Sequence, residues 1–499
     1  MERMIHTHSL GRAARYYSER IALASNGKSS TFRELHDRVG RIAAALRRHG
    51  FHVGDRLAIL LPNEPEYIEL VYACVWLGVI VVPLNTRLSL VEIDRILLDS
   101  SPHGLIRHSS LPVPTVQIAW QRVLDQEPLN VPSDSCPEAI YDPGTILALI
   151  YTSGTTGHPK GAVVTHANIM ANIHHANYWM PYGEAGVYLH AAPIFHILDL
   201  PFMFAAPALG ARQVTIPKFT AKSFCETVER ERVTHTVLAP TMINSLTQFP
   251  DLKKYDLSSL QLVAYGGSPM APDLVLRTRE VLPGVKLMQG YGLTETGFLT
   301  GLKDHEHTKR RLMSCGKTCP GVDLRVVDES GKEVGVGQHG ELVVRGSNVM
   351  SRYWNNPQES ALAMRDGMFR TGDIGYRDAE GYFYILDRLK DMIVTGGENV
   401  YCSEVEAVIY EHPAVREAAV FGVPDPQWGE LVVACVVLKP GETLRADELI
   451  AHCRRSLANY KIPRRIEFSE NELPKSGSGK VLKRMLRERF WAQQERAVA

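Results

Sequence analysis

The stretch YTSGTTGHPKG at Tyr151–Gly161 indicates the fold class, and it directly follows the apolar run TILALI at 145–150. An apolar run that ends in a loop rich in Gly, Ser and Thr is typical of a buried strand followed by an anion-binding loop. Hydroxyls, glycines and one lysine suit a polyphosphate, because both side chains and backbone approach the anion closely. The candidate phosphate-binding residues are Thr152, Ser153, Gly154, Thr155, Thr156, Gly157 and Lys160.

This loop lacks the Gly-Lys-Ser/Thr ending of a Walker A motif, since Pro159 precedes Lys160 and Gly161 follows it. The competing interpretation is a flexible surface turn. The strand pattern in front of the loop and the helical pattern HANIMANIHHA at 166–176 behind it favour a phosphate loop instead.

Helix and strand patterns alternate on both sides of the loop. Residues 31–49 place their apolar residues on one helical face with Thr31 as the cap, and RLAILLP at 56–62 is typical of a buried strand. This alternation predicts an α/β fold with a large N-terminal domain of βα-layered sheets. Short alternating strands at 320–385 predict a small β-rich subdomain. An αβ pattern then predicts a small α+β C-terminal domain, with the boundary at 388–391.

The composition is that of an ordinary globular protein. The 499 residues include 55 Lys+Arg and 55 Asp+Glu, so the zero net charge disfavours nucleic acid and anionic membrane as partners. The longest uncharged apolar run, at 70–84, is shorter than the ~20 residues of a membrane span, and we expect a helix followed by a strand. The eight cysteines form no disulfide framework and the first residues contain no apolar signal core, so we expect a cytoplasmic protein. The oligomeric state is not indicated.

Four further motifs accompany the loop, namely AYGGSP at 264–269, YGLTETG at 291–297, FRTGD at 369–373 and PKSGSGK at 474–480. In this order the set resembles the adenylate-forming superfamily of acyl-CoA synthetases, adenylation domains, luciferases and amide bond synthetases. The resemblance covers essentially the whole chain. It implies an N-terminal adenylation domain at 1–388, a hinge at 389–390 and a mobile C-terminal domain at 391–499. It also implies ATP and Mg²⁺ as cofactors and two half-reactions: a carboxylic acid becomes an acyl-adenylate with release of pyrophosphate, and the acyl group then passes to a nucleophile.

The same resemblance assigns roles to single residues. Glu295 helps to hold Mg²⁺, which prefers a hard oxygen ligand, and Lys390 takes the hinge position. Lys480 is the catalytic lysine, because an anionic carboxylate must attack an anionic phosphate and a cation lowers that barrier. The nucleotide-binding residues that the resemblance implies, beyond those of the loop, are Gly266, Gly267, Ser268, Tyr291, Gly292, Thr294, Asp373 and Arg388.

The segment APIFHILDLPF at 192–202 resembles the acid-pocket segment of the superfamily, with His196 as a further catalytic candidate and Asp199 in place of the usual glycine. A buried packing histidine is the alternative for His196. A carboxylate in an apolar segment needs a partner or a task, and Asp199 is predicted as the base that deprotonates an amine acceptor. A helix cap or a salt bridge at the pocket rim is the alternative. The predicted acid pocket contains Phe195, Met242, Tyr265, Gly290 and Phe298.

These features favour an aryl acid as substrate and an amine as acceptor, as in the bacterial amide bond synthetases that the segment most resembles. The first alternative is an aryl- or acyl-CoA ligase, in which coenzyme A is the acceptor. A nucleotide-binding module without turnover and a luciferase-like oxidase are the remaining alternatives, and the presence of Lys480, Glu295 and the hydroxyl-rich loop disfavours the former.

Overall fold

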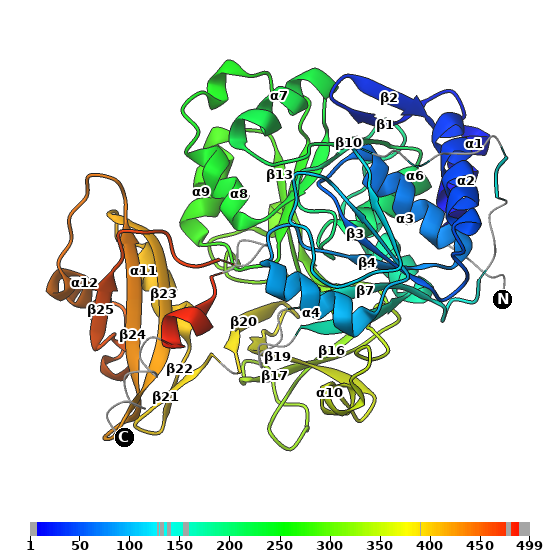
Figure 1. The fold of residues 1–499 in the computed structure, drawn as a ribbon. Helices are drawn as coiled ribbons and strands as arrows, with labels where there is room; N and C mark the ends of the chain where they lie inside the picture. Colours follow the sequence, from blue (N-terminus) through cyan, green and yellow to red (C-terminus); the bar gives the residue numbers. More distant parts are fainter. Residues whose placement is uncertain are drawn as a thin grey trace.

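The structure is a computed structural model that describes residues 7–126, 129, 134–136, 141–152, 159–389, 391–475 and 481–488. Within these residues the strands form four sheets of nine, six, five and five strands. Three sheets and most helices make up a large N-terminal domain, and the last sheet belongs to a small C-terminal domain beside it (Figure 1). The predicted α/β fold with two domains of unequal size is therefore confirmed.

The six-stranded sheet comes from the first third of the chain. Its strands lie in the order β6 (Trp120–Val123), β5 (Gly104–Arg107), β3 (Arg56–Leu60), β4 (Ile80–Pro83), β7 (Ile146–Thr152) and β8 (Lys160–Thr165). Neighbours are parallel except β7 and β8, which form an antiparallel hairpin. The helical pattern at 166–176 forms α5 (His166–Trp179), as predicted, whereas the strand β8 between the phosphate loop and this helix was not predicted. The apolar run at 70–84 forms the end of α3 (Pro65–Leu77) and β4, as predicted.

The nine-stranded sheet carries the largest number of candidate residues. Its order is β15 (Lys317–Thr318), β14 (Gly297–Leu302), β13 (Lys286–Leu293), β12 (Leu262–Gly266), β11 (His235–Leu238), β9 (Val187–His190), β10 (Arg212–Thr215), β1 (Ile21–Ser25) and β2 (Lys28–Thr31). The strands from β13 to β1 are parallel, and the pairs at both edges are antiparallel. Ligands of such sheets bind at the carboxyl ends of the parallel strands. The AYGGSP and YGLTETG motifs lie at those ends.

Helices fill the space between the two large sheets and cover their outer faces. Alternate residues of one strand face opposite layers: Tyr188 packs in the central layer, whereas Leu189 packs in the outer one. The central layer contains α1 (Thr7–Tyr16), α2 (Phe32–Arg48), α3, α5 and α6 (Leu200–Ala208). The outer layers contain α7 (Ala221–Glu231), α8 (Pro240–Thr247) and α9 (Pro272–Val281) on the nine-stranded sheet, and α4 (Leu90–Ser100) on the six-stranded sheet.

Thr31 begins α2, as the sequence predicts. Its hydroxyl accepts a hydrogen bond from Glu34 N at 3.2 Å, and the Glu34 carboxylate accepts one from Thr31 N at 2.8 Å. This reciprocal capping box satisfies two backbone donors at the helix start.

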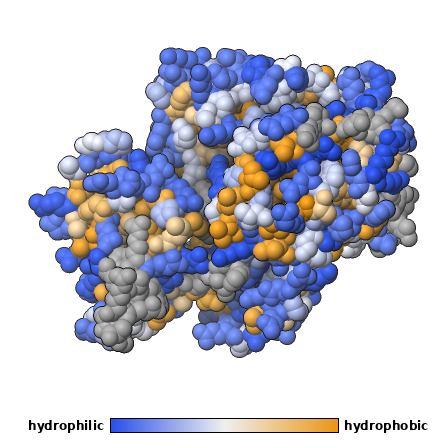
Figure 2. All heavy atoms as spheres, viewed as in Figure 1, coloured by the Kyte–Doolittle hydropathy of each residue, from blue (hydrophilic) through white to orange (hydrophobic). Residues whose placement is uncertain are grey.

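Helix α4 is apolar on two sides. Ile93, Ile96 and Leu97 are buried against the sheet. Leu90, Val91 and Leu98 are exposed, and Figure 2 shows hydrophobic residues gathered in this region of the face that it presents. None of the described helices is both long and apolar enough to cross a bilayer.

The antiparallel β-rich subdomain that the sequence predicts is also present. Its strands are β16 (Asp323–Val327), β17 (Gly340–Arg345), β19 (Met368–Arg377) and β18 (Met364–Arg365), with β20 (Phe383–Arg388) paired to β19. Helix α10 (Pro357–Ala363) precedes β18. The strand β20 ends at Arg388, next to the predicted hinge at 389–390, of which Lys390 lies outside the described residues. The domain boundary at 388 and the hinge stay predictions.

The C-terminal domain has its own core on each face of a five-stranded sheet. The order is β22 (Glu398–Val400), β21 (Ile393–Thr395), β24 (Gly429–Leu438) and β23 (Val415–Asp425), with β25 (Arg465–Phe468) parallel to β24. Helices α11 (Cys402–Tyr410) and α12 (Ala446–Cys453) cover one face. Leu473, Val481 and Leu486 pack on the other face. The segment that contains PKSGSGK is thus attached to the sheet by apolar residues before and after it.

The β-rich subdomain should depend on its buried leucine at 342. Leu342 is 0% exposed, and we expect Leu342→Ala to lower the free energy of unfolding by about 3 kcal/mol, because the substitution leaves a cavity. Leu362 on α10 is 71% exposed, and Leu362→Ala should cost less than about 0.5 kcal/mol. Urea denaturation measures both variants, and equal losses would contradict the packing described here.

Candidate active site

Three predicted nucleotide-binding residues from three strands meet at one carboxylate. Tyr291 Oη on β13 donates a hydrogen bond to Asp373 Oδ2 at 2.6 Å, and Arg388 Nε lies 2.5 Å from Asp373 Oδ1. Asp373 and Arg388 are opposite each other in the register of β19 and β20, which accounts for their pairing. Asp373 is 3% exposed. A carboxylate offers about four acceptor positions, and Tyr291 and Arg388 are two of the partners of Asp373.

Burial and charge both act on this cluster. Burial, followed by the charge of Asp373, raises the pKa of Tyr291 well above its ordinary value, so the phenol stays protonated and donates. Burial is the largest single influence and lowers the pKa of Arg388, but Asp373, Tyr291, Glu295 and Asp391 together outweigh it, so the pKa is raised. A neutral phenol and a cationic guanidinium therefore both face an anionic carboxylate.

Glu341 supports the FRTGD segment from the neighbouring strand β17. Its Oε1 accepts from Gly372 N at 3.1 Å, and its Oε2 pairs with Arg370. Thr371 Oγ1 accepts from Asp373 N at 3.0 Å and donates to Leu342 O at 2.8 Å. These bonds fix the backbone that presents Asp373.

The predicted metal ligand Glu295 has a partner that sequence analysis missed. Tyr353 Oη donates to Glu295 Oε1 at 2.7 Å, and Met350 N donates to Glu295 O at 2.7 Å. Tyr353 also lies beneath Lys160, whose Nζ is 5.6 Å from the centre of the ring. One tyrosine therefore contacts both the candidate metal carboxylate and the lysine of the phosphate loop.

A short backbone pairing brings Tyr353 to this position. Ala162 on β8 and Tyr353 form an isolated antiparallel bridge, and Trp354 N donates to Gly161 O at 2.7 Å. Lys160 Nζ also forms an ion pair with Glu359 of α10 at 2.6 Å. The sequence around Tyr353 carried no local signal for these contacts, since the pairing spans almost 200 positions.

The ends of β12, β13 and β14 approach one another closely. A Cβ at Gly266 would lie 2.4 Å from Gly290 O, and one at Gly292 would lie 1.7 Å from Gly297 O. Gly267 has a φ of 79°. Only glycine fits these positions without a shift of the backbone, and Leu198, which sequence analysis also missed, packs against the pair at 266 and 267. Ser268 and Thr294 are half-buried beside these glycines in the sequence.

Part of the predicted site lies outside the described residues. This holds for Ser153, Gly154, Thr155, Thr156 and Gly157 of the phosphate loop, for Lys390 and for Lys480. The two ends of the loop are described: Thr152 and Lys160 are register partners at the base of the β7–β8 hairpin.

The predicted acid-pocket residues belong to two different layers. Phe195 and Phe298 are buried in the central layer, and the Phe298 ring requires glycine at 290, where a Cβ would lie 2.7 Å from it. Tyr265 and Met242 pack instead in the outer layer on the other face of the nine-stranded sheet, and Tyr265 Oη is 2.8 Å from His307 Nε2. The structure therefore does not bring these four side chains together into one slot.

His196 is held by its own loop. Its Nδ1 accepts from Leu198 N at 3.2 Å, and burial lowers the pKa of His196 to about 4, so the imidazole is neutral near pH 7.

Asp199 is buried among structural partners, which differs from the pocket environment that the sequence predicted. It is 0% exposed, Oδ1 accepts from Tyr188 Oη at 2.5 Å and Oδ2 accepts from His190 Nδ1 at 2.6 Å. It occupies the cap position of α6 without a capping hydrogen bond, and its contact with His190 is fully buried rather than at a pocket rim. His190 Nε2 lies 2.9 Å from Gln213 Oε1. The contacts of Asp199 are those of a buried carboxylate with structural partners, and they give its predicted role as a base no support.

The described residues contain no group of three or more His, Cys, Asp or Glu side chains that would hold a metal ion alone. A lone carboxylate fits Mg²⁺ nevertheless, because protein-bound Mg²⁺ usually takes one or two carboxylates and completes its shell with water and substrate phosphates. Glu295, oriented by Tyr353, meets this requirement.

Removal of the Tyr353 hydroxyl should weaken the hold on the metal. We expect Tyr353→Phe to raise the Mg²⁺ concentration needed for half-maximal ATP–pyrophosphate exchange about tenfold, because outer hydrogen bonds to a metal ligand orient it. A Mg²⁺ titration of the exchange rate measures the effect. Tyr384→Phe, whose hydroxyl bonds Asp378 at 3.3 Å, is the control, and an unchanged Mg²⁺ requirement in Tyr353→Phe would contradict the contact's role.

Comparison with known proteins identifies the family. Residues 10–354 match the family described as AMP-binding enzyme, and residues 404–480 match the AMP-binding enzyme C-terminal domain. The feruloyl-CoA synthase of Amycolatopsis sp is 39% identical over 483 residues, which cover 96% of this chain and 98% of that protein. The amide bond synthetase McbA from Marinactinospora thermotolerans aligns with a TM-score of 0.89 at 31% identity, covering 97% and 100% of the two chains. O-succinylbenzoate coenzyme A synthetase from Bacillus subtilis, solved with ATP and magnesium ion, aligns with a TM-score of 0.85 at 32% identity, covering 97% and 98%. The chain belongs to the AMP-binding enzymes and is an adenylate-forming ligase.

Proposed function

We propose that this chain converts an aryl acid to its acyl-adenylate and then transfers the acyl group to the thiol of coenzyme A. The observation that carries the adenylation step is the meeting of Tyr291, Asp373 and Arg388 next to the glycine-lined strand ends. Coenzyme A takes the place of the amine that the sequence favoured, because Asp199 has no exposed surface and both of its oxygens are engaged.

The residues present fit ATP and Mg²⁺. Asp373 would accept from the ribose hydroxyls, Glu295 would hold Mg²⁺, and Lys160 would face the phosphates. Bound Mg²⁺ would neutralise phosphate charge during adenylation. Lys480 would supply the cation between the acid carboxylate and the α-phosphate, where two anions must otherwise approach each other. His196, neutral near pH 7, would border the acid without adding charge.

An aryl acid suits the aromatic side chains near the strand ends. Phe202 and Phe298 meet edge to face with their centroids 5.8 Å apart, and Phe195 lies in the same buried layer. The high identity to feruloyl-CoA synthases supports the same class of acid. Phe298 would set the width of the acid site, since its ring excludes any side chain at 290.

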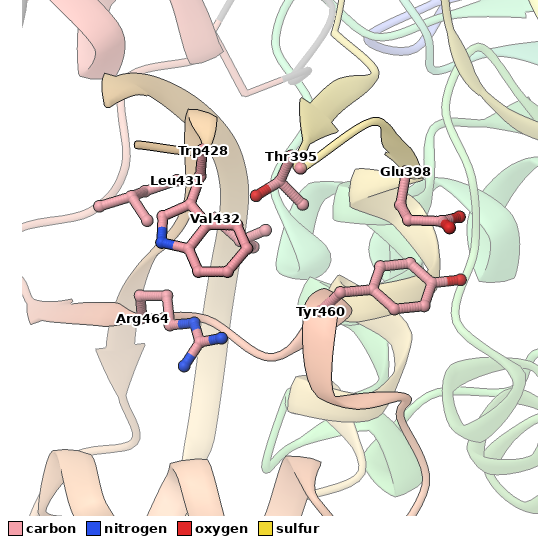
Figure 3. A pocket seen from close by; sticks show the side chains of 8 residues that line it. Thr395, Glu398, Trp428, Leu431, Val432, Tyr460 and Arg464 are labelled. Carbon is pink, nitrogen blue, oxygen red and sulfur yellow. The ribbon is translucent and has the colours of Figure 1, made fainter. Parts of the chain in front are cut away.

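A small cavity in the C-terminal domain supports a nucleotide-bearing acceptor. It has a volume of about 130 Å³ and is lined by Trp428, Tyr460 and Arg464 together with Thr395, Gly396, Glu398, Leu431 and Val432 (Figure 3). Trp428 and Tyr460 are 43% and 38% exposed, and exposed aromatic rings provide faces on which a base can stack. Arg464 has the guanidinium that suits a phosphate. Coenzyme A carries both a base and phosphates, whereas a simple amine carries neither.

The eight cysteines fit this chemistry in a reducing compartment. All eight are buried, and burial raises the pKa of Cys315 to about 12. We therefore keep the cytoplasm as the proposed location.

Amide synthesis is the second candidate function. It is supported by the alignment with McbA over essentially the whole of both chains.

The acceptor is tested by single-turnover reactions. A panel of aryl acids is incubated with ATP, and coenzyme A or an amine is then added in parallel. We expect thioester to form at a catalysed rate and amide to form only at the rate of uncatalysed aminolysis.

Trp428→Ala should raise the KM for coenzyme A about tenfold, because the base of coenzyme A loses one stacking partner, and it should leave pyrophosphate exchange unchanged. Phe468→Ala, which removes an exposed ring outside the cavity, is the matched control. Catalysed amide formation without thioester would overturn the proposal in favour of the second candidate.

The lysine is tested separately. Lys480→Ala should reduce pyrophosphate exchange at least ~10²-fold, since it removes a charge needed in the transition state, and it should spare transfer from a supplied acyl-adenylate. Arg484→Ala removes an exposed cation nearby and should change neither step. Exchange that survives in Lys480→Ala would show that the catalytic lysine is misassigned.

A further inference from the structure

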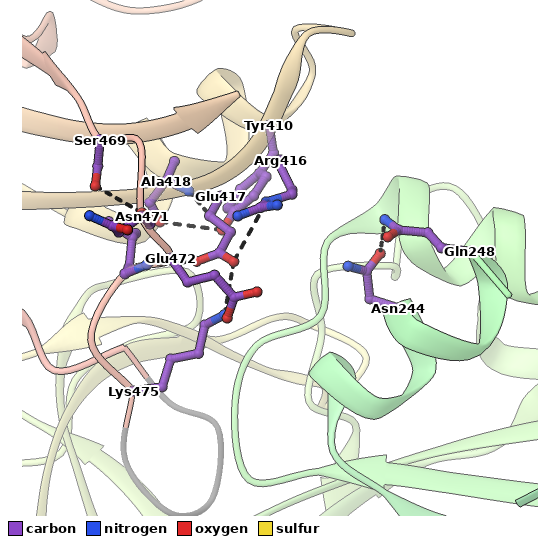
Figure 4. A network of polar contacts seen from close by, with 11 residues as sticks. Asn244, Gln248, Tyr410, Arg416, Glu417, Ala418, Ser469, Asn471, Glu472 and Lys475 are labelled. Carbon is purple, nitrogen blue, oxygen red and sulfur yellow. Dashed lines mark hydrogen bonds and ion pairs between the residues drawn. The ribbon is translucent and has the colours of Figure 1, made fainter. Parts of the chain in front are cut away.

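An ion pair in the C-terminal domain holds the chain immediately before the segment that contains Lys480. Glu417 on β23 uses both oxygens: Oε1 lies 2.8 Å from Lys475 Nζ, and Oε2 accepts from Leu473 N at 3.2 Å. The pair is mostly buried, with 14% of the Glu417 side chain and 26% of the Lys475 side chain exposed. Glu472 approaches Lys475 at 3.4 Å from the segment itself (Figure 4).

A second set of contacts holds the chain immediately after the segment. Lys475 and Val481 form an isolated antiparallel bridge, and Leu482 N donates to Pro474 O at 2.7 Å. Lys483 Nζ lies 2.8 Å from Glu406 Oε1 on α11, and both side chains are less than one-fifth exposed. Residues 474–475 are therefore paired with residues 481–482. The first stretch is also held to β23 through Glu417, and Lys483 is held to α11 through Glu406.

The location of these contacts suits a catalytic task. Figure 4 shows the cluster around Glu417 on the side of the C-terminal domain that faces helix α8, where Asn244 and Gln248 lie. The two oxygens of Glu417 bond only to the segment at 473–475 among the hydrogen bonds of the described residues. Arg416 Nε, on the same strand, is 3.9 Å away.

We propose that Glu417 is a positioning residue that, through Lys475, sets the place from which Lys480 reaches the reacting carboxylate and α-phosphate. This inference rests on the proposed role of Lys480. A catalytic side chain becomes less effective when the backbone that carries it shifts, because a displacement of 1 Å can lower the reaction rate ~10²-fold. The ion pair holds Lys475, five positions before Lys480 in the sequence, and Glu417 also accepts from Leu473 N.

The test separates the two half-reactions. Glu417→Gln keeps an acceptor for Leu473 N but removes the charge that holds Lys475. We expect kcat for pyrophosphate exchange to fall on the order of tenfold, with the KM values for ATP and acid within about twofold of the original. Transfer of the acyl group from a supplied acyl-adenylate to coenzyme A should not change.

Partner variants and a control complete the experiment. Lys475→Met should lose as much exchange activity as Glu417→Gln, Lys475→Arg should retain it, and the double variant should be no worse than either single variant, because the two residues act as one unit. Asp447→Asn removes a fully exposed ion pair with Arg445 in the same domain and should change nothing. Thermal melting of each variant shows whether the domain stays folded.

Each outcome decides between the possibilities. Equal losses in both half-reactions, or full exchange activity in a folded Glu417→Gln variant, would overturn this inference while leaving the proposed function intact. Exchange that survives in Lys480→Ala would instead remove the role on which the inference rests. A selective loss of exchange that Lys475→Arg avoids would support it.

Discussion

The carboxylate of Asp373 joins parts of the molecule that the chain builds separately. Tyr291 reaches it from the nine-stranded sheet, and Arg388 reaches it from the last strand before the C-terminal domain. A mostly buried charge of this kind must keep its partners, since the loss of one leaves the other without compensation. The geometry of the candidate nucleotide site, the attachment of the β-rich subdomain and the start of the domain connection therefore depend on the same three side chains.

The elements that were predictable from the sequence have their signals within a few residues. The capping box at Thr31 and Glu34, the helix and strand within the apolar run and the short strands of the β-rich subdomain follow from local periodicity and turn residues. Motifs that resemble those of a known superfamily selected Tyr291, Asp373 and Arg388 as candidate residues, and the structure shows that the three side chains meet. Local patterns therefore predicted most of the fold, and motif resemblance selected the candidate residues without predicting their mutual contacts.

What was missed depends on contacts between distant parts of the chain. Tyr353 reaches Glu295 only because the chain at 352–354 pairs with β8. Asp199 has Tyr188 and His190 as partners because the loop that follows β9 folds back on that strand. The side chains of Tyr265 and Phe298 point to opposite sides of one sheet, which a list of pocket segments does not reveal. Neutrality of the whole chain likewise hides how its cations are paired: Lys160, Arg388, Lys475 and Lys483 each face a carboxylate. A polyphosphate that binds Lys160 must replace its ion pair with Glu359. The net stabilisation is the energy of the new ion pair minus that of the old one, which is less than the attraction of an unpaired cation.

The burial of all eight cysteines makes the protein a convenient object for site-directed labelling. Buried thiols with raised pKa values react slowly with maleimides, so a cysteine introduced at an exposed position would carry nearly all of a dye. One such position on α10 and another on α12 would place a donor and an acceptor on the two domains without removal of any native cysteine. Energy transfer between the dyes would then report the distance between the two labelled positions during turnover, in the protein's otherwise native sequence.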